Sequence, residues 1–174
     1  MNDVADRKSV RMHGAKDGTP YLRNNWDVLI EGKSLSKTLT VDLGCGNGRN
    51  TRFMIDKGIL SDNTRAYDMV DDFGEKLLLG HEVIPLNDGA ADIILANYIF
   101  MFLDVIEIRE LVKEISRIAA VDCRVMVELE AAKQSRTPDE ESRDRLETLL
   151  KALFMANKFS FVKQNNGRFI AEKR

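Results

Sequence analysis

Several residue types are scarce in this chain, and each shortage narrows what the protein can be. Its 174 residues include two cysteines and three prolines. Two cysteines are too few for the disulfide framework of a small secreted domain, so we expect reduced thiols and a cytoplasmic protein. No apolar run approaches the roughly 20 residues that a membrane-spanning helix needs. Residues 1–11 are too polar for a secretory signal, and we expect no membrane partner.

An excess of charge of one sign is absent as well. Basic side chains number 26 and acidic ones 28, for a net charge of −2 at pH 7. This balance excludes a general attraction to nucleic acid or to an anionic membrane, but not a local basic patch. The hydrophobic content of 44% and the chain length suit one globular core. We predict a flexible polar arm at residues 1–18 and a single domain at residues 19–174.

The hydrophobic pattern alternates between strand and helix. Apolar, β-prone runs predict strands at residues 38–43, 64–69, 92–96 and 124–129, and a fragment of a third strand at 83–86. Helical spacing predicts helices from Thr19 to about Gly32 and at residues 48–57, 106–119 and 137–154. The sequence Asn165-Asn166-Gly167 predicts a hairpin between two final strands. This order is typical of an α/β fold whose mostly parallel sheet ends in an antiparallel edge.

The most informative stretch runs from Val41 to Arg49 and reads VDLGCGNGR. A strand, a glycine-rich turn and a helix in this order form the first unit of a nucleotide-binding α/β fold. Glycine permits the tight turn and lets the backbone approach a ligand closely. The carboxylate of Asp42 would repel a pyrophosphate but attract the ammonium group of an amino acid. A nucleoside with an amino-acid tail, which describes S-adenosylmethionine, therefore fits this motif.

The segment from Asp42 to Gly48 resembles the first motif of class I S-adenosylmethionine-dependent methyltransferases. The resemblance extends from Leu39 to Lys173, and the stretches 42–50 and 101–103 look most similar to the small tellurite- and thiopurine-type enzymes. It implies an α/β, Rossmann-like fold with a mostly parallel seven-stranded sheet, helices on both faces and an antiparallel C-terminal edge hairpin. It also implies an enzyme that uses S-adenosylmethionine. We expect no metal site.

The resemblance assigns the glycine motif to the cofactor site. The motif residues expected there are Asp42, Gly44, Cys45, Gly46, Asn47 and Gly48. Asp68 directly follows the second strand, where a carboxylate can accept hydrogen bonds from both ribose hydroxyls, and Met69 stands next to it. Alternatively, Asp68 caps the turn at 68–72, which would leave the ribose to Asp71 or Asp72.

Adenine recognition departs from the family's pattern. Gly80 stands where related proteins have an acid that binds the adenine amino group. His81 or Glu82, or backbone groups alone, would then read the ring. After the fourth strand, Asn97 and Tyr98 are expected to bind the cofactor, where the resemblance places them under the methionine sulfur and facing the acceptor. We identify no side chain as a catalytic base, and the catalytic residues stay unassigned.

Methyl transfer to a small molecule is the first functional hypothesis, because the chain has no obvious inserted domain for docking a macromolecule. The transfer would be an in-line displacement that depends on alignment and on exclusion of water. One alternative is methylation of protein or RNA, which a local excess of cations favours at Arg7, Lys8, Arg11, Lys16 and Arg23. The other alternative is a regulatory protein that binds S-adenosylmethionine without catalysis.

Overall fold

A seven-stranded sheet forms the centre of the computed structural model, which describes residues 17–70, 72–129 and 140–174. The strands lie in the order β3-β2-β1-β4-β5-β7-β6. β1 to β5 pair in parallel, whereas β7 runs antiparallel to both β5 and β6. This order confirms the predicted α/β, Rossmann-like sheet and its antiparallel C-terminal edge. The strands are β1 (Thr40–Leu43), β2 (Thr64–Asp68), β3 (Glu75–Lys76), β4 (Ala91–Asn97), β5 (Ala119–Glu128), β6 (Phe159–Asn165) and β7 (Arg168–Lys173).

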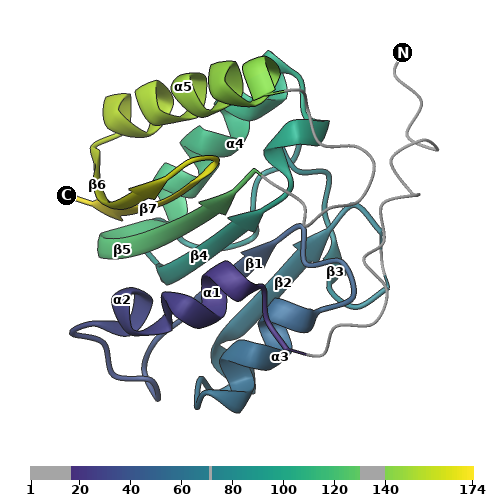
Figure 1. Cartoon of the computed structure of the whole chain (residues 1–174). Helices are drawn as coiled ribbons and strands as arrows, with labels where there is room; N and C mark the ends of the chain where they lie inside the picture. Colours follow the sequence, from purple (N-terminus) through teal and green to yellow (C-terminus); the bar gives the residue numbers. More distant parts are fainter. Residues whose placement is uncertain (1–16, 71, 130–139) are drawn as a thin grey trace.

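Helices cover both faces of the sheet (Figure 1). One face carries α4 and α5, and the other carries α1, α2 and α3. The α-helices are α1 (Pro20–Asn24), α2 (Trp26–Ile30), α3 (Arg49–Asp56), α4 (Val105–Ile118) and α5 (Glu140–Ala156), and short 3-10 helices occur at Ser61–Asn63 and Phe100–Phe102. The predicted hairpin is confirmed, because β6 and β7 are joined at Asn166-Gly167. The first residues of the helix predicted at 137–154 lie outside the described ranges, and α5 begins at Glu140.

The position of β4 inside the sheet explains why its sequence is apolar without interruption. Successive side chains of a strand point to opposite faces. Ile94 packs in the core beneath α4 and α5, whereas Leu95 packs with Trp26 and Phe53 under the other helices. The rings of Trp26 and Phe53 meet edge to face, with centroids 5.6 Å apart. Both faces of β4 are therefore buried, as expected for an inner parallel strand.

The N-terminal helix was predicted as one continuous element, but the structure divides it into α1 and α2. Thr19 caps it as expected, because its hydroxyl accepts the N–H of Leu22 at 3.2 Å. The helix is interrupted at Asn25, whose side-chain amide donates to the carbonyl of Tyr21 at 2.7 Å. Such local side-chain bonds compete with the helical backbone. The predicted arm lies outside the described residues except for Asp17 and Gly18, and Gly18 is buried.

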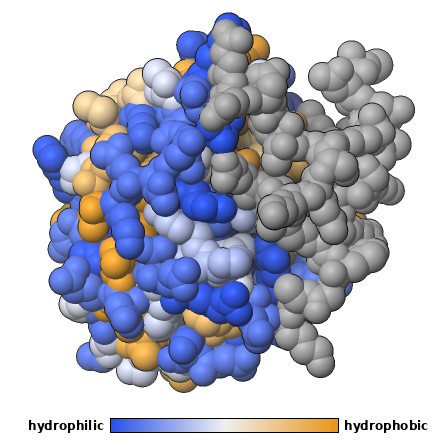
Figure 2. Space-filling view, viewed as in Figure 1, coloured by the Kyte–Doolittle hydropathy of each residue, from blue (hydrophilic) through white to orange (hydrophobic). Residues whose placement is uncertain are grey.

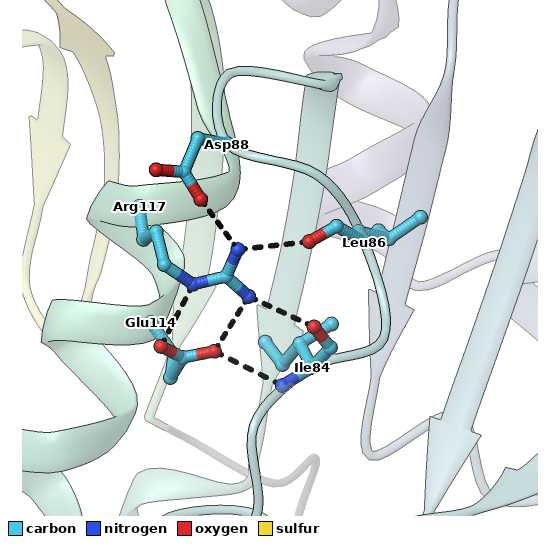
Figure 3. Close-up of polar contacts among 5 residues, drawn as sticks. All are labelled: Ile84, Leu86, Asp88, Glu114 and Arg117. Carbon is cyan, nitrogen blue, oxygen red and sulfur yellow. Dashed lines mark hydrogen bonds and ion pairs between the residues drawn. The ribbon is translucent and has the colours of Figure 1, made fainter.

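The strand fragment predicted at residues 83–86 is wrong. The third strand is the short β3, which follows β2 closely in sequence and pairs with it. Arg117 of α4 holds the segment predicted as a strand, since its guanidinium donates to the carbonyls of Ile84 and Leu86, each at 2.8 Å (Figure 3). The guanidinium also pairs with Asp88 and Glu114, each at 2.8 Å. A side chain thus satisfies backbone groups that a neighbouring strand would otherwise satisfy.

The surface shown in Figure 2 is mostly hydrophilic where residues are described, and its hydrophobic residues form separate small patches. Among the described helices, none combines the length and the apolar content needed to cross a bilayer.

Candidate cofactor and active site

The glycine motif forms the turn between β1 and α3. Gly44, Gly46 and Gly48 have φ values of +71°, +54° and +76°, a region that residues with a Cβ rarely adopt. The carbonyl of Tyr67 on β2 accepts the N–H groups of Gly44 and Cys45 at 2.8 and 3.1 Å, which anchors the turn to the neighbouring strand. A Cβ at Gly46 would meet no described atom within 4 Å. Open space therefore lies beside the backbone at Gly46.

Asp42 is a buried carboxylate at the base of this turn and is 1% exposed. Its Oδ2 accepts a hydrogen bond from the Thr51 hydroxyl on α3 at 2.7 Å. Burial raises the pKa of Asp42 to about 6, and the hydrogen bond from Thr51 opposes this rise while the nearby Asp68 adds to it. A cationic ligand group would favour the ionised form of Asp42. The site thus contains a buried anion that a bound cation would stabilise.

Asp68 joins the end of β2 to the glycine turn. Its Oδ2 accepts the N–H of Gly46 at 2.8 Å, and its Oδ1 accepts the N–H of Val70 at 3.1 Å. The second bond is the turn-capping contact considered as an alternative role, so the side chain caps the turn and also faces the glycine loop. A carboxylate has about four acceptor positions, which leaves room for ribose hydroxyls. The ribose assignment stays a prediction; Asp72 is exposed, and Asp71 lies outside the described residues.

The remaining residues of the motif shape the turn. Cys45 is buried, and Gly74 packs so closely that a Cβ there would lie 2.6 Å from the Cys45 sulfur. Burial raises the pKa of this thiol, which therefore stays protonated. The side-chain oxygen of Asn47 accepts the N–H of Arg49 at 3.3 Å at the start of α3. Met69 is half-buried beside Asp68. Their cofactor contacts stay predictions.

The candidates for adenine recognition both contact other protein groups. The Nε2 of His81 lies 2.7 Å from Oε1 of Glu107, in the first turn of α4. The Oε2 of Glu82 accepts the N–H of Leu78 at 2.6 Å. These bonds place residues 78–82 against the beginning of α4. Neither bond tests adenine recognition, which stays a prediction for His81, Glu82 or the backbone.

Asn97 ends β4 next to the glycine turn. The pairing of Asp42 with Leu95 places Asn97 level with Gly44. Asn97 is 5% exposed, and neither its amide oxygen nor its amide nitrogen has a hydrogen-bond partner among the described residues. Buried amide groups are almost always hydrogen-bonded, so a buried amide without a protein partner is usually explained by a ligand or a bound water. Asn97 is therefore available to a ligand at the carboxyl edge.

Tyr98 follows in a strained conformation, with φ at +62°. Its N–H donates to the carbonyl of Glu128 at 2.7 Å, and its hydroxyl donates to Oε2 of Glu128 at 2.9 Å. Burial and the Glu128 carboxylate raise the pKa of the Tyr98 hydroxyl, so it stays neutral and serves as a donor. Backbone strain of this kind is concentrated at functional sites.

The structure brings the main predicted residues to adjacent strand ends. Asp42, Asp68 and Asn97 stand at the carboxyl ends of β1, β2 and β4, where ligands of such sheets bind. The open backbone at Gly46, the buried anion of Asp42 and the unpartnered amide of Asn97 fit a nucleoside with an amino-acid tail. His81 contacts Glu107 in the first turn of α4. Within the described ranges, no group of His, Cys, Asp or Glu side chains is arranged to hold a metal ion.

Sequence reasoning missed several polar residues around this edge. They belong to four different elements and had no common spacing in the chain: Thr19, Asn50, Thr51, Glu128 and Arg168. Thr51 had one usable signal, a hydroxyl in the first turn of the helix after the glycine motif.

Comparison with known families gives one match over most of the chain. Residues 22–133 match the family described as tellurite resistance protein TehB. No curated protein matches the chain.

Solved structures with a similar fold include several methyltransferases. An S-adenosylmethionine-dependent methyltransferase from Aquifex aeolicus has a TM-score of 0.61 and 15% identity, over 91% of this chain and 95% of that chain. A TehB-like methyltransferase from Corynebacterium glutamicum has a TM-score of 0.58 and 15% identity, over 88% and 94%. Magnesium protoporphyrin IX methyltransferase from Synechocystis, with bound S-adenosylmethionine, has a TM-score of 0.63 and 14% identity, over 99% and 93%. At these identities the likeness shows the fold alone.

Proposed function

Because the chain belongs to the family of tellurite resistance protein TehB and is an S-adenosylmethionine-dependent methyltransferase, we propose that it methylates a small molecule by in-line displacement. The observation that carries this proposal is the open backbone at Gly46 beside the buried carboxylate of Asp42. The chain has one sheet and helices that pack directly on it, with no second domain in the described ranges to receive a macromolecule.

The side chains at the carboxyl edge have distinct roles in this proposal. Asp42 attracts the ammonium group of the cofactor, and Asp68 binds its ribose while holding Gly46 in place. Asn97 and Tyr98 line the site next to the acceptor. When bound, S-adenosylmethionine supplies a methyl group already activated on its sulfonium. The protein therefore contributes alignment and exclusion of water more than proton transfer.

The acceptor class that we propose is one that needs no strong base. The polar side chains assigned to this site already have protein partners: Tyr98 donates to Glu128, and the carboxylates of Asp68 and Glu128 accept hydrogen bonds. A soft nucleophile that is ionised or easily ionised, such as a thiol or a chalcogen oxyanion, needs no strong base. The name of the matched family points to tellurite as one acceptor to test. The Synechocystis relative is named for a porphyrin, which is also a small molecule.

The test is a two-stage assay with the full chain. Calorimetry with S-adenosylmethionine and S-adenosylhomocysteine should show binding of both. Labelled S-adenosylmethionine is then incubated with tellurite, a thiol or magnesium protoporphyrin, and we expect label in one of these small molecules. Label in a protein or RNA fraction of a lysate would instead support the alternative acceptors, and loss of that labelling with rising salt would identify RNA. Binding without any transfer would support the regulatory alternative.

The state of the two cysteines supports our proposal that the protein works in the cytoplasm, a reducing compartment. Cys45 and Cys123 are both free and buried. Disulfides are rare in the cytosol, where thiols stay reduced.

A further inference from the structure

A buried carboxylate outside the glycine motif connects several segments of the chain. Glu128 ends β5 and has no exposed surface. Its Oε1 accepts a hydrogen bond from the Thr19 hydroxyl, and its Oε2 accepts one from the Tyr98 hydroxyl at 2.9 Å. The Nε of Arg168 on β7 lies 3.5 Å from the same Oε2. One side chain therefore contacts the start of α1, the turn after β4 and the start of β7.

Strand register places Glu128 directly beside the unpartnered amide. Asn97 pairs with Glu128, and Glu128 pairs with Arg168. Paired residues on adjacent strands point to the same face of a sheet. Residues two positions earlier on β4 and β5, Leu95 and Met126, belong to the core beneath α1, α2 and α3. The side chains of Asn97 and Glu128 thus form a polar layer on that face, at the carboxyl edge.

Glu128 holds Tyr98 at two points. Its carbonyl accepts the Tyr98 N–H at 2.7 Å, and its carboxylate accepts the Tyr98 hydroxyl. A tyrosine at φ +62° persists only when its surroundings fix it in place. Because Tyr98 directly follows Asn97, the same two bonds also fix the orientation of the turn that carries the Asn97 amide.

Glu128 also sets the position of the chain before α1. The hydroxyl of Thr19 is bound to Glu128, and the N–H of Thr19 donates to Oδ1 of Asn50 at 2.9 Å. Asn50 lies in the first turn of α3, immediately after the glycine motif. Both Thr19 and Asn50 are buried. The start of α1 is therefore fixed between the end of β5 and the first turn of α3, which follows the cofactor-binding turn.

We propose that Glu128 is a positioning residue for methyl transfer. It holds the turn at Asn97 and Tyr98 and the chain at Thr19 in place, and these two segments form two walls on the acceptor side of the site. This inference rests on the proposed function. Glu128 is not a base in it, because both carboxylate oxygens are occupied by hydroxyl donors and the side chain has no exposed surface. Burial raises the pKa of Glu128, and the hydrogen bonds from Thr19 and Tyr98 and the cations that face it, Arg168 and Arg49, oppose this rise.

The variants Glu128→Gln and Tyr98→Phe test this inference, alone and combined. Glutamine keeps the size of the side chain but removes the charge, and phenylalanine removes the hydroxyl alone. We expect each single variant to lower turnover about tenfold or more. We expect the double variant to lose no more than either single variant, because groups that act as a unit are not additive. The dissociation constant of S-adenosylhomocysteine should rise by a clearly smaller factor than turnover falls, because the walls lie on the acceptor side, although Asn97 is also predicted to contact the cofactor.

Glu172→Gln is the matched control. Glu172 also pairs with a buried arginine, at 2.8 Å from Arg124, but it lies near the other end of β7. This variant should lower the melting temperature as much as Glu128→Gln without changing turnover. A second readout uses tyrosine labelled with ¹³C at Cζ, and the Tyr98 resonance is assigned by its loss in Tyr98→Phe. In Glu128→Gln this resonance should move and broaden even without cofactor.

The outcomes separate the two proposals. A wild-type protein that binds neither S-adenosylmethionine nor S-adenosylhomocysteine overturns the proposed function and this inference with it. If the wild type binds them, the inference alone is overturned by turnover in Glu128→Gln equal to that in Glu172→Gln, or by cofactor affinity that falls as much as turnover. If no acceptor in the panel is methylated, the Tyr98 ¹³C resonance alone tests the inference. An unchanged Tyr98 signal in Glu128→Gln overturns it.

Discussion

The N–H of Gly46 donates to Oδ2 of Asp68 across 2.8 Å, which joins the middle of the glycine turn to the end of the neighbouring strand. The bond orients the carboxylate toward the loop. A single substitution at Asp68 would therefore remove the support of the turn together with the ribose contact that we propose.

Replacing Asp68 should therefore weaken cofactor binding strongly. Hydrogen bonds to a charged group contribute roughly 1.5–3 kcal/mol each, so Asp68→Asn should lower the affinity for S-adenosylhomocysteine by about tenfold or more. Calorimetry on the two proteins measures this. Asp72→Asn is the control, since Asp72 is exposed two residues after Val70 and was the alternative candidate for the ribose. A larger loss in Asp72→Asn than in Asp68→Asn would transfer the ribose role to Asp72.

Gly46→Val should abolish cofactor binding while leaving the domain folded. The branched side chain would occupy the open space beside the turn. Gly32→Val is a matched control, because Gly32 also has positive φ, at +75°, and nothing described within 4 Å, but it lies after α2. Both variants should lose roughly 1–2 kcal/mol of stability from the left-handed backbone, measured by urea unfolding. Equal cofactor affinity in the two variants would contradict the placement of the ligand.

Cofactor affinity should depend on pH through Asp42. Its pKa is about 6 in the folded protein, so the carboxylate is protonated below this pH and loses its attraction for an ammonium group. Affinity should rise from about pH 5 to about pH 7 and then level off. Asp42→Asn should remove the dependence. Thr51→Val should shift the midpoint upward, because the Thr51 hydrogen bond lowers the pKa of Asp42. A flat profile in the wild type would show that Asp42 does not contact the ammonium group.

Asp42 should affect the stability of the cofactor-free protein in the opposite direction, so that its contribution to stability decreases as the pH rises. The folded-state pKa of Asp42 is raised from 3.8 to about 6, so the folded state keeps a proton that the unfolded state releases. Stability from this group is fully present below about pH 4 and is lost as pH rises through about 6. The difference in melting temperature between Asp42→Asn and the wild type should accordingly grow between these values. A constant difference would mean that Asp42 is not buried in solution.

Arg117→Met should destabilise the protein by about 2–4 kcal/mol, because carbonyls of the segment 84–88 lose their donor. The guanidinium donates to the carbonyls of Ile84 and Leu86 and pairs with the carboxylates of Asp88 and Glu114 (Figure 3). Lys113→Met on the same helix is the control, since Lys113 is exposed and pairs with Glu110. It should change stability by less than about 0.5 kcal/mol in urea unfolding. Equal effects would show that the Arg117 contacts contribute nothing.

The prediction of a flexible arm implies that deletion of residues 1–16 leaves the melting temperature unchanged, whereas deletion of residues 1–19 should lower it. The longer deletion removes Thr19, which caps α1 and bonds to Asn50 and Glu128. Differential scanning calorimetry of the two truncated proteins measures the boundary. A large loss in the shorter variant would place the start of the domain before residue 17.

Local chemistry was enough to predict most of the architecture. The alternation of strand and helix patterns predicted the α/β sheet, and Asn165-Asn166-Gly167 predicted the final hairpin. The glycines of the motif predicted a tight turn, and in the structure Gly44, Gly46 and Gly48 form it with positive φ. These features depend on backbone conformations and periodicities that neighbouring residues determine among themselves.

Only the tertiary structure decided the contacts between distant segments. The fragment at 83–86 has apolar residues suited to a strand, but Arg117 from α4 satisfies its carbonyls instead. The continuous helix expected after Thr19 breaks at Asn25. Glu128 gave no sequence signal beyond its position after a strand, because its partners Thr19, Tyr98 and Arg168 lie far from it in the chain. A sequence pattern reports the periodicity of one segment, whereas a buried polar group needs partners that only the packing of several segments supplies.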